Sequence, residues 1–331
     1  MATTIKEIAK LANVSIATVS RALNNDKKVK PVTKQLVLSI AKKLNYNPNL
    51  LARSFVTKKS NIIGLVMPDI YGEFFMEVIR GVDEVCYNNG YYTMVTSSHS
   101  NRSIVEAIID YMSKGIVGGL ILMTPLVEDD VKETLAKSKI PLVVISGKSE
   151  LQKWDSISID NFNGSYAVVD HLAKKGFKKI AHITGPKRNN DSIQRELGYK
   201  QALKDNGLQL NNKWIVTGDF TINGGQAACE SLMKMDNPPD AIFASNDMMA
   251  IGCYVAARFL KLKIPVDFAV AGFDDIFVSQ FLNPRLTSVH VPIYELGTNA
   301  AQILIDRMKG NKDPIKIKKI PTELVIGGSC G

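Results

Sequence analysis

Apolar and polar positions recur with helical spacing at the N-terminal end of the chain. Residues 4–12 predict a short amphipathic helix, with Thr4 as N-cap and Glu7 three residues later completing a capping box. Its expected inward face consists of Ile5, Ile8, Ala9 and Leu11. Another helix is expected over residues 34–44, preceded by Pro31. Its expected core residues are Leu36, Val37, Ile40, Ala41 and Leu44.

Between these two helices the pattern predicts another, over residues 16–23. Asn13 permits a tight turn before it, Val14 fills the angle between the helices, and Ser15 is a suitable N-cap. Two helices joined by a three-residue turn form a helix-turn-helix, whose second helix presents its N-terminal residues to the major groove of DNA. We expect DNA contacts from Thr4, Ser15, Ile16, Ala17, Thr18, Ser20, Arg21 and Asn24. Arg21 could bind a guanine in bidentate fashion or hold a phosphate.

The charge of the chain is concentrated in the same region. Residues 1–60 contain twelve Lys or Arg and two acids, a formal charge of +10, whereas the whole chain is +9. The remaining residues therefore sum to about −1, by subtraction of +10 from +9. A polyanionic partner for the N-terminal segment explains this distribution. A solvated basic tail is the alternative, but these charges are interleaved with an ordered apolar pattern.

Beyond residue 60 short apolar strands alternate with amphipathic helices. The first set of strands is expected at 62–67, 91–97, 119–123 and 142–145, with helices near 74–89, 103–114 and 129–138. The second set is expected at 180–184, 214–217, 241–244 and 268–272, with helices near 163–175, 195–206, 224–235 and 247–259. This alternation predicts an α/β body of two doubly wound parallel sheets, with a ligand site at the carboxyl ends of their strands.

Three N-terminal motifs together resemble the LacI/GalR (lactose-repressor) family of bacterial transcription regulators. They are Thr-Ile-Lys-Glu-Ile-Ala at 4–9, Val-Ser-Ile-Ala-Thr-Val-Ser-Arg at 14–21 and Tyr-Asn-Pro-Asn-Leu-Leu-Ala-Arg-Ser at 46–54. The resemblance implies hinge helices that pair in the minor groove, where a leucine of each subunit kinks the DNA. Phe55 stands at the position of that leucine, and Phe also serves as an intercalating wedge. The implied hinge contacts are Asn49, Ala52, Arg53 and Phe55; alternatively, Phe55 packs on the body.

The resemblance covers essentially the whole chain and implies its domain organisation. It places a helix-turn-helix domain at 1–47, a hinge helix and linker at 48–60, and an effector-binding and dimerisation domain at 61–331. The body is expected to resemble periplasmic binding proteins, with an N-lobe of about 61–160 and 291–322 and a C-lobe of about 161–290 and 323–331. A homodimer on a pseudo-palindromic operator follows from the same resemblance, and the absence of a heptad tail favours a dimer over a tetramer.

Polar and aromatic residues follow the predicted strands of the body, where a ligand would bind. The candidates are Asp69, Phe74, Phe75, Ser146, Asp191, Arg195, Phe220, Asn246 and Asp274. By family match Arg195, Asn246 and Asp274 hold the effector, while Phe220 and Phe74 or Phe75 stack on it. Asp191 and Asp247 could instead be helix N-caps, and Phe75 and Phe273 could belong to the core.

The expected effector is a sugar or sugar derivative, because Arg, Asp and Asn bind pairs of hydroxyl groups and aromatic rings cover the C–H face of a sugar. Lys187 and Arg188 keep a sugar phosphate open, and a purine-type co-repressor is the alternative. No cofactor or metal is expected, since the chain lacks a GxGxxG motif between strand and helix, a GxxxxGK[ST] loop and clustered His or Cys.

Other classes of protein are less compatible with the sequence. A sugar-modifying enzyme is a weak alternative because no catalytic Ser/His/Asp set or carboxylate pair stands out. A solute-binding protein would suit the body but not the basic head. No apolar run reaches the length of a membrane span, and the N-terminus has no signal-peptide pattern. We therefore expect a cytoplasmic, DNA-binding transcription regulator that acts as a repressor and is not an enzyme.

Overall fold

The computed structural model describes residues 4–23, 26, 28–46, 60–68, 72–98, 103–113, 115–124, 129–137, 140–145 and 154–331. The chain divides into two units, Met1–Ser60 and Asn61–Gly331. Each unit has its own hydrophobic core.

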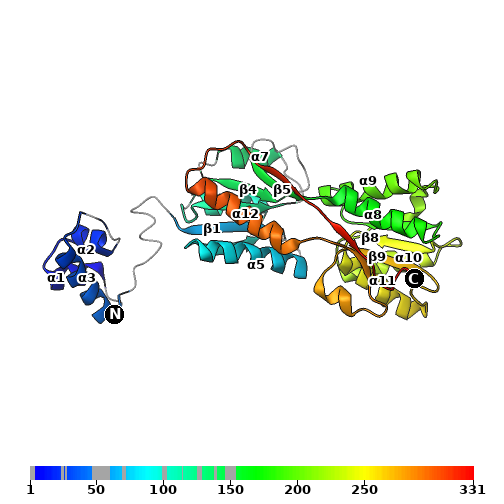
Figure 1. Ribbon diagram of the computed structural model, residues 1–331, viewed down its shortest axis with the longest axis horizontal. Helices are drawn as coiled ribbons and strands as arrows, with labels where there is room; N and C mark the ends of the chain where they lie inside the picture. Colours follow the sequence, from blue (N-terminus) through cyan, green and yellow to red (C-terminus); the bar gives the residue numbers. More distant parts are fainter. Residues whose placement is uncertain are drawn as a thin grey trace. The chain divides into compact units, whose positions relative to one another are not determined.

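The N-terminal unit is a small bundle of three described helices, α1 (Ile5–Ala12), α2 (Ile16–Leu23) and α3 (Pro31–Lys43) (Figure 1). Each helix contacts the other two. The buried residues are Ile8, Ala9, Ala12, Val19, Ala22, Val37 and Ala41. Four of these seven are alanines, whose small side chains let the short helices approach closely.

The prediction that Leu11 and Leu36 belong to the core of this unit is wrong. Leu11 is 61% exposed and Leu36 is 46% exposed. In α1 the 3.6-residue period places Ala12, four residues after Ile8, on the buried stripe, and Leu11 falls beside it. In α3 the stripe is centred on Val37 and Ala41, which leaves Leu36 at its edge.

The predicted turn chemistry is present in the structure. The Thr4 amide donates a hydrogen bond of 2.9 Å to the Glu7 carboxylate at the start of α1. Asn13 adopts the left-handed conformation, with φ of 51°, and ends the same helix. The Thr18 amide donates to Ser15 Oγ over 3.1 Å, so Ser15 caps α2.

The body contains two six-stranded sheets, each covered by helices (Figure 1). The first has the order β11-β5-β4-β3-β1-β2 and is parallel throughout. Its strands are β1 (Ile62–Met67), β2 (Tyr92–Ser97), β3 (Gly119–Met123), β4 (Leu142–Ile145), β5 (Asp155–Ile159) and β11 (Ile317–Ile320). Its helices are α5 (Glu73–Asn88), α6 (Ile104–Ser113), α7 (Asp129–Ala136) and α12 (Ile293–Met308).

The second sheet has the order β12-β10-β9-β8-β6-β7, and only its pairing of β10 with β12 is antiparallel among the pairs described. Its strands are β6 (Ile180–Thr184), β7 (Ile215–Thr217), β8 (Ala241–Ala244), β9 (Ala269–Asp274), β10 (Thr287–His290) and β12 (Glu323–Val325). Its helices are α8 (Asn161–Lys174), α9 (Asn190–Asp205), α10 (Ile222–Met233) and α11 (Asp247–Leu260), with short helices η1 (Asn212–Trp214) and η2 (Phe277–Phe281).

Alternate residues of each strand supply the cores on the two faces of its sheet. In β8, Ala241 and Phe243 pack on the side of α8 and α9, whereas Ile242 and Ala244 pack on the side of α10 and α11. This burial on both faces explains why the strands are short, continuous apolar runs. The α/β fold class expected from the alternation is confirmed.

The chain passes between the two lobes after β5, after β10 and after β11. Helix α12 consequently packs on α5 of the first lobe although it follows β10 of the second (Figure 1). Their backbones meet at two glycines. A Cβ atom added to Gly297 would lie 2.3 Å from the Val78 carbonyl oxygen, and one added to Gly81 would lie 2.3 Å from that of Tyr294. This close crossing fixes the returning helix to the first lobe.

Candidate DNA-binding surface and effector pocket

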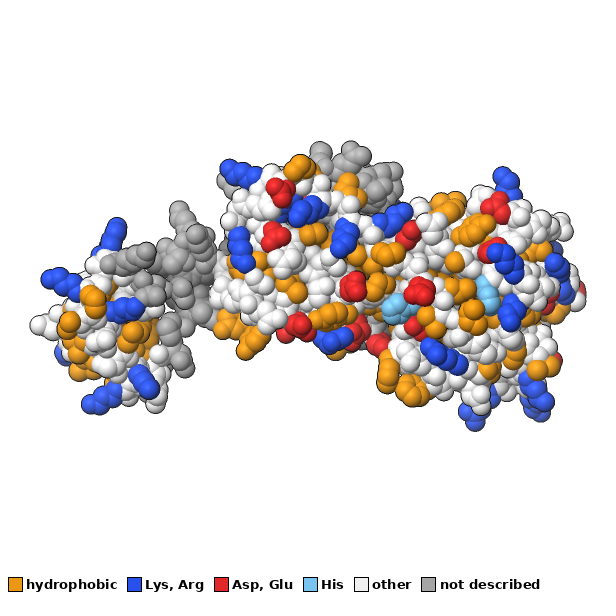
Figure 2. Space-filling view, viewed as in Figure 1, with side chains coloured by type: hydrophobic (Ala, Val, Ile, Leu, Met, Phe, Trp, Pro, Cys, Tyr) orange, Lys and Arg blue, Asp and Glu red, His pale blue; other side chains and the backbone are white. Residues whose placement is uncertain are grey.

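The start of α2 forms an exposed surface on the N-terminal unit. Ser15, Ile16, Ala17 and Arg21 are exposed, while Val19 on the opposite side is fully buried. Thr18 and Ser20 are half-buried, and Thr4 is exposed at the start of α1. Figure 2 shows basic side chains projecting from several sides of this unit. The predicted contacts Asn24, Asn49, Ala52, Arg53 and Phe55 lie outside the described residues.

A cavity of about 90 Å³ lies between the two lobes of the body. It is at the carboxyl ends of β3, β4 and β5 in the first lobe and faces the starts of α9 and α11 in the second. The predicted effector residues that it brings together are Phe74, Phe75, Asp191, Arg195, Phe220, Asn246 and Asp274. Asp69 and Ser146 lie outside the described residues.

Arg195, on the second turn of α9, is the central cation of the pocket. It is 4% exposed, and its Nε donates a hydrogen bond of 2.8 Å to Asn161 Oδ1. Its Nη1 donates to the Ser245 carbonyl, and the guanidinium lies 3.7 Å from the centre of the Phe273 ring. Nη2 is 3.6 Å from Asp274 Oδ1. These contacts hold the guanidinium plane in one orientation.

Two carboxyl groups accompany this guanidinium. Asp191 Oδ1 accepts a hydrogen bond of 2.7 Å from the Asn161 amide, so Asn161 connects Asp191 with Arg195. Asp274 Oδ1 is buried and has no hydrogen-bond partner. An unpartnered buried carboxyl oxygen is costly and is available to bind a hydroxyl group.

The electrostatic environment disfavours ionisation of both carboxyl groups. Burial raises the pKa of Asp274 to about 7; the Arg195 charge lowers it, and the Asp191 charge raises it further. Burial also raises the pKa of Asp191, against the opposing effects of Arg195 and Asn161. Near neutral pH the pair can therefore both accept and donate hydrogen bonds.

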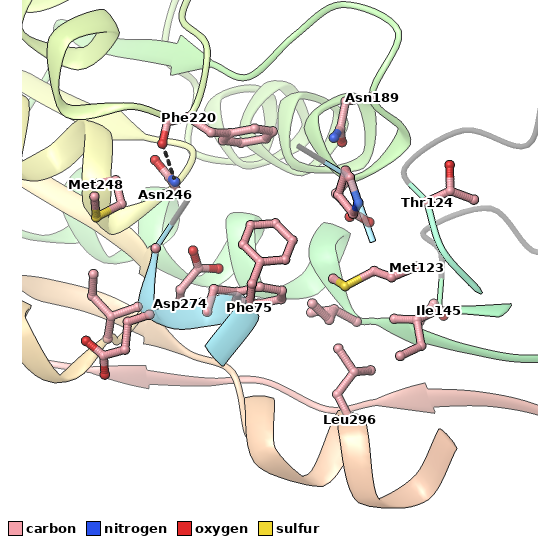
Figure 3. Close-up of a pocket in the computed structure, with 18 of the residues that line it drawn as sticks. Phe75, Met123, Thr124, Ile145, Asn189, Phe220, Asn246, Met248, Asp274 and Leu296 are labelled. Atoms are coloured by element: carbon pink, nitrogen blue, oxygen red, sulfur yellow. Dashed lines mark hydrogen bonds between the residues drawn. The ribbon is translucent and has the colours of Figure 1, made fainter. Parts of the chain in front are cut away.

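Asn246 and Phe220 form the neighbouring part of the wall (Figure 3). Asn246 caps α11 by accepting a hydrogen bond of 2.9 Å from the Met249 amide, and its Nδ2 donates to the Phe220 carbonyl over 3.1 Å. Phe220 has a φ of 66°, and its ring lies so close to Gly185 that an added Cβ there would be 2.2 Å from Cζ. Asn246 therefore holds the backbone that carries the Phe220 ring.

The first lobe supplies the apolar side of the pocket. Phe74 and Phe75 at the start of α5 pack edge to face, with ring centres 5.5 Å apart. Figure 3 shows the Phe75 ring in the pocket with Met123, Ile145 and Leu296 on its first-lobe side and Phe220 across from them. Both phenylalanines also pack against the core cluster, so the core role and the pocket role coexist.

Asp191 and Asp247 are not helix N-caps, which was the alternative role expected for them. Asn189 caps α9 by accepting from the Ser192 amide, and Asn246 caps α11. Asp191 lies in the first turn of α9. Asp247 accepts hydrogen bonds from Ser288 Oγ and the Ile276 amide, so it connects α11 to the segment after β9.

Sequence reasoning missed Asn161 and Asn189. Asn161 follows β5, which was not predicted as a strand because the polar residues Asp155, Ser156 and Ser158 interrupt its apolar pattern. Asn189 precedes α9, which begins at Asn190 and not near residue 195 as expected. Asparagine is among the preferred N-cap residues, so Asn189 followed by Asn190-Asp191 carried a signal for this helix start.

Asp274→Asn is expected to reduce the pH dependence of stability. The pKa of Asp274 in the folded chain is about 7, above its ordinary value of 3.8, so between these values the folded state holds a proton that the unfolded state has released. The contribution of Asp274 to the free energy of unfolding therefore falls as pH rises from about 4 to about 7. Asparagine does not titrate, so the variant should gain stability relative to the parent across that window.

Urea unfolding at several pH values between about 4 and 8 measures this difference. Asp236→Asn, at an exposed position, is the matched control and should show no such trend. A difference between Asp274→Asn and the parent that does not change with pH would refute the raised pKa.

Comparisons with known protein families give one match in each of the two units of the chain. Residues 4–49 match the family described as bacterial regulatory proteins, lacI family, and residues 169–330 match a periplasmic binding protein-like domain. The chain is 32% identical over 328 residues to the HTH-type transcriptional repressor CytR of Escherichia coli (strain K12), covering 99% of this chain and 96% of that repressor. The chain belongs to the lacI family of bacterial regulatory proteins.

Solved structures show the same fold in other regulators. A transcriptional regulator CelR–cellobiose complex has 27% identity and a TM-score of 0.76, with 99% of each chain covered. The lac repressor dimer bound to operator and the anti-inducer ONPF has 24% identity and a TM-score of 0.88, covering 100% of this chain and 99% of that chain. The lacI-family chain is thus a DNA-binding transcription regulator with two parallel-sheet lobes.

Within the described ranges, no group of three or more His, Cys, Asp or Glu is arranged to hold a metal ion. None of the helices in the described part of the chain is long and apolar enough to cross a membrane.

Proposed function

We propose that this chain is a homodimeric repressor whose operator affinity is controlled by an uncharged, hydroxyl-bearing effector, a sugar or sugar derivative, bound between its lobes. The observation that carries the proposal is the arrangement of Arg195, Asp191 and Asp274 in a cavity whose other lining residues are mostly apolar. A fixed guanidinium and two carboxyl groups suit adjacent hydroxyls, and the Phe75 and Phe220 rings suit the C–H faces of a sugar. The structure of CelR with cellobiose supports this ligand class.

The charges of the pocket favour a neutral ligand over a phosphate ester. Its described lining contains the acids Glu73, Asp191 and Asp274 but one cation, Arg195, two of whose nitrogens already donate hydrogen bonds within the protein. Lys187 and Arg188 are exposed and are not among these lining residues. One cation among three acidic side chains does not compensate the two charges of a phosphate dianion, so binding of such a ligand would need a further cation.

Exposed apolar residues on the body support the proposed dimer. At one edge of the first sheet β2 lacks charged residues and exposes Tyr92 and Val95, whereas β11 at the opposite edge exposes Lys318 and Lys319. Charged edge strands resist pairing and uncharged ones permit it. Other exposed apolar residues are Met76, Tyr87, Phe259, Phe277 and Phe281. Figure 2 shows hydrophobic side chains along the lower edge of the body in this view.

We also propose how the N-terminal unit and the hinge contact DNA. The exposed start of α2 would read base edges, with Thr4 and the half-buried Thr18 and Ser20 near the backbone. Asn49, Ala52, Arg53 and Phe55 are proposed to act in the minor groove. The effector would bias the lobe arrangement, and a coupling of about 1–3 kcal/mol suffices for such a switch.

A thermal-shift screen tests the effector class. The full chain would be heated with neutral sugars, their phosphate esters and nucleobases, and at about 100 times its dissociation constant a binding sugar stabilises the chain by about 2.7 kcal/mol. We expect a neutral sugar to raise Tm by more than its phosphate ester does.

Lys187→Ala provides the control because its side chain is exposed outside the described lining. This variant should respond to the neutral sugar as the parent does. A larger shift with a phosphate ester, lost in Lys187→Ala, would contradict the neutral-ligand proposal. A shift with nucleobases alone would favour the purine-type alternative.

A further inference from the structure

Glu73 connects the two lobes at the rim of the pocket. It is the first residue of α5 in the first lobe and is half-buried. Its Oε1 accepts a hydrogen bond of 2.6 Å from the Phe277 amide, and its Oε2 lies 3.4 Å from the Val278 amide that donates to it. Both amides belong to η2 in the second lobe, and the two partners are 204 and 205 positions from Glu73 in the sequence.

The segment that Glu73 holds is also a wall of the pocket. Ile276 lines the cavity directly before Phe277, and the Ile276 amide donates to Asp247 Oδ2 over 2.9 Å. Three successive amides thus donate hydrogen bonds to two acidic side chains, Asp247 from the second lobe and Glu73 from the first. A charged acceptor makes stronger hydrogen bonds with amides than a neutral one.

The start of α5 approaches the second lobe at another point. A Cβ atom added to Gly72, directly before Glu73, would lie 4.0 Å from Met248 Cγ in the first turn of α11. Gly72 has a φ of +135°, a conformation that favours glycine. The backbone is therefore arranged to bring the end of α5, and the carboxylate that follows, against the second lobe.

We propose that Glu73 is a positioning residue that sets the separation of the two lobes across the pocket through this bridge to Phe277 and Val278. The bridge joins the helix that carries Phe74 and Phe75 to the segment that carries Ile276, so it fixes facing walls of one cavity. The inference rests on the proposed function only in assigning that cavity to an effector. Breaking the bridge should widen the distribution of lobe separations without ligand.

The bridge can be broken from either lobe with a matched control. Glu73→Ala removes the acceptor, and Glu77→Ala is its control, because Glu77 lies one turn along the same helix and pairs with Arg80. Phe277→Pro removes the amide donor at the first position of η2, where proline is tolerated. The preceding residue, Ile276, has a ψ of 153°, which is the extended conformation that a residue before proline prefers. Phe277→Ala is its control, because it loses the same ring but keeps the amide.

Pulsed electron paramagnetic resonance on the full chain measures the lobe separation. Spin labels would be placed at Lys137→Cys in the first lobe and Lys213→Cys in the second, both exposed. The native cysteines are buried and are expected to escape labelling. Labelled chains would be diluted with unlabelled chains so that distances within one chain dominate. Glu73→Ala and Phe277→Pro should shift or broaden the distances, and Glu77→Ala and Phe277→Ala should not.

Hydrogen exchange provides the second readout. The Phe277 and Val278 amides should exchange about three- to tenfold faster in Glu73→Ala, because the bridge is partly exposed to solvent. Unchanged exchange there would overturn the bridge itself. Faster exchange with unchanged lobe distances would show that Glu73 only stabilises η2 and would overturn its positioning role. Neither readout needs an effector, so a failed sugar screen would count against the proposed function alone.

Discussion

A chain shortened to residues 61–331 is expected to lose DNA binding while its body stays folded. Residues 1–60 carry a formal charge of +10 and contain the exposed start of α2, whereas the remainder sums to about −1. A near-neutral body has little attraction for a polyanion. Fluorescence anisotropy with duplexes that the full chain selects from a random pool measures the loss. Circular dichroism establishes whether the shortened chain remains folded, and light scattering tests whether it forms the proposed dimer.

The salt dependence of DNA affinity distinguishes an interface with many phosphate contacts from weak, nonspecific attraction between the chain and DNA. If the two heads of a dimer neutralise about six to ten phosphates, affinity should fall by about 10³–10⁵ between 50 and 200 mM salt. Within the head, Arg21→Ala at the exposed face of α2 should reduce the preference for the selected duplex. Lys42→Ala at the end of α3 is the matched control and should weaken all duplexes alike. Retained binding by residues 61–331 would refute the assignment of the DNA surface to the head.

The head could be predicted closely because its signals are local. Thr4, Glu7, Asn13 and Ser15 define helix ends within a few residues of their hydrogen-bond partners. The burial of individual leucines was harder to predict. In an eight-residue helix such as α1, few positions define the centre of the apolar stripe, and the sequence pattern alone placed Leu11 inside.

The body shows where local patterns stop being informative. The helix α12 was expected in the first lobe only from the family resemblance, because neither its period nor its charge indicates which sheet it covers. The pocket is similarly non-local: Arg195 and Asp274 could be proposed from their motifs, but Asn161, which connects Arg195 to Asp191, is 34 positions away from Arg195. The Glu73 bridge spans still more of the chain, and no spacing in the sequence indicates it.

Arg195→Ala is expected to be strongly destabilising and to abolish the response to the effector. The substitution removes the hydrogen bonds to Asn161 and Ser245 and leaves Asp191 and Asp274 without their cation. Removal of one partner from a buried charged pair typically costs about 3–5 kcal/mol. The cost should be partly offset here because the raised pKa of Asp274 allows that carboxyl to become protonated. Urea unfolding measures the free-energy change, and the thermal shift with a binding sugar measures the loss of response.

Arg195→Met, alone and combined with Asp274→Asn, separates the charge of Arg195 from the volume of its side chain. As a control, Lys187→Ala, at an exposed position on the loop before α9, should change stability by less than about 0.5 kcal/mol. Combining Arg195→Met with Asp274→Asn removes both charges and keeps most of the volume, so the double variant should be more stable than the sum of its two single variants predicts. That recovery is expected because the cost lies in an uncompensated buried carboxylate and not in lost packing. A double variant as unstable as the sum of its two single variants would show that the guanidinium acts through packing against Phe273, and a sugar response that survives Arg195→Ala would remove this residue from the proposed site.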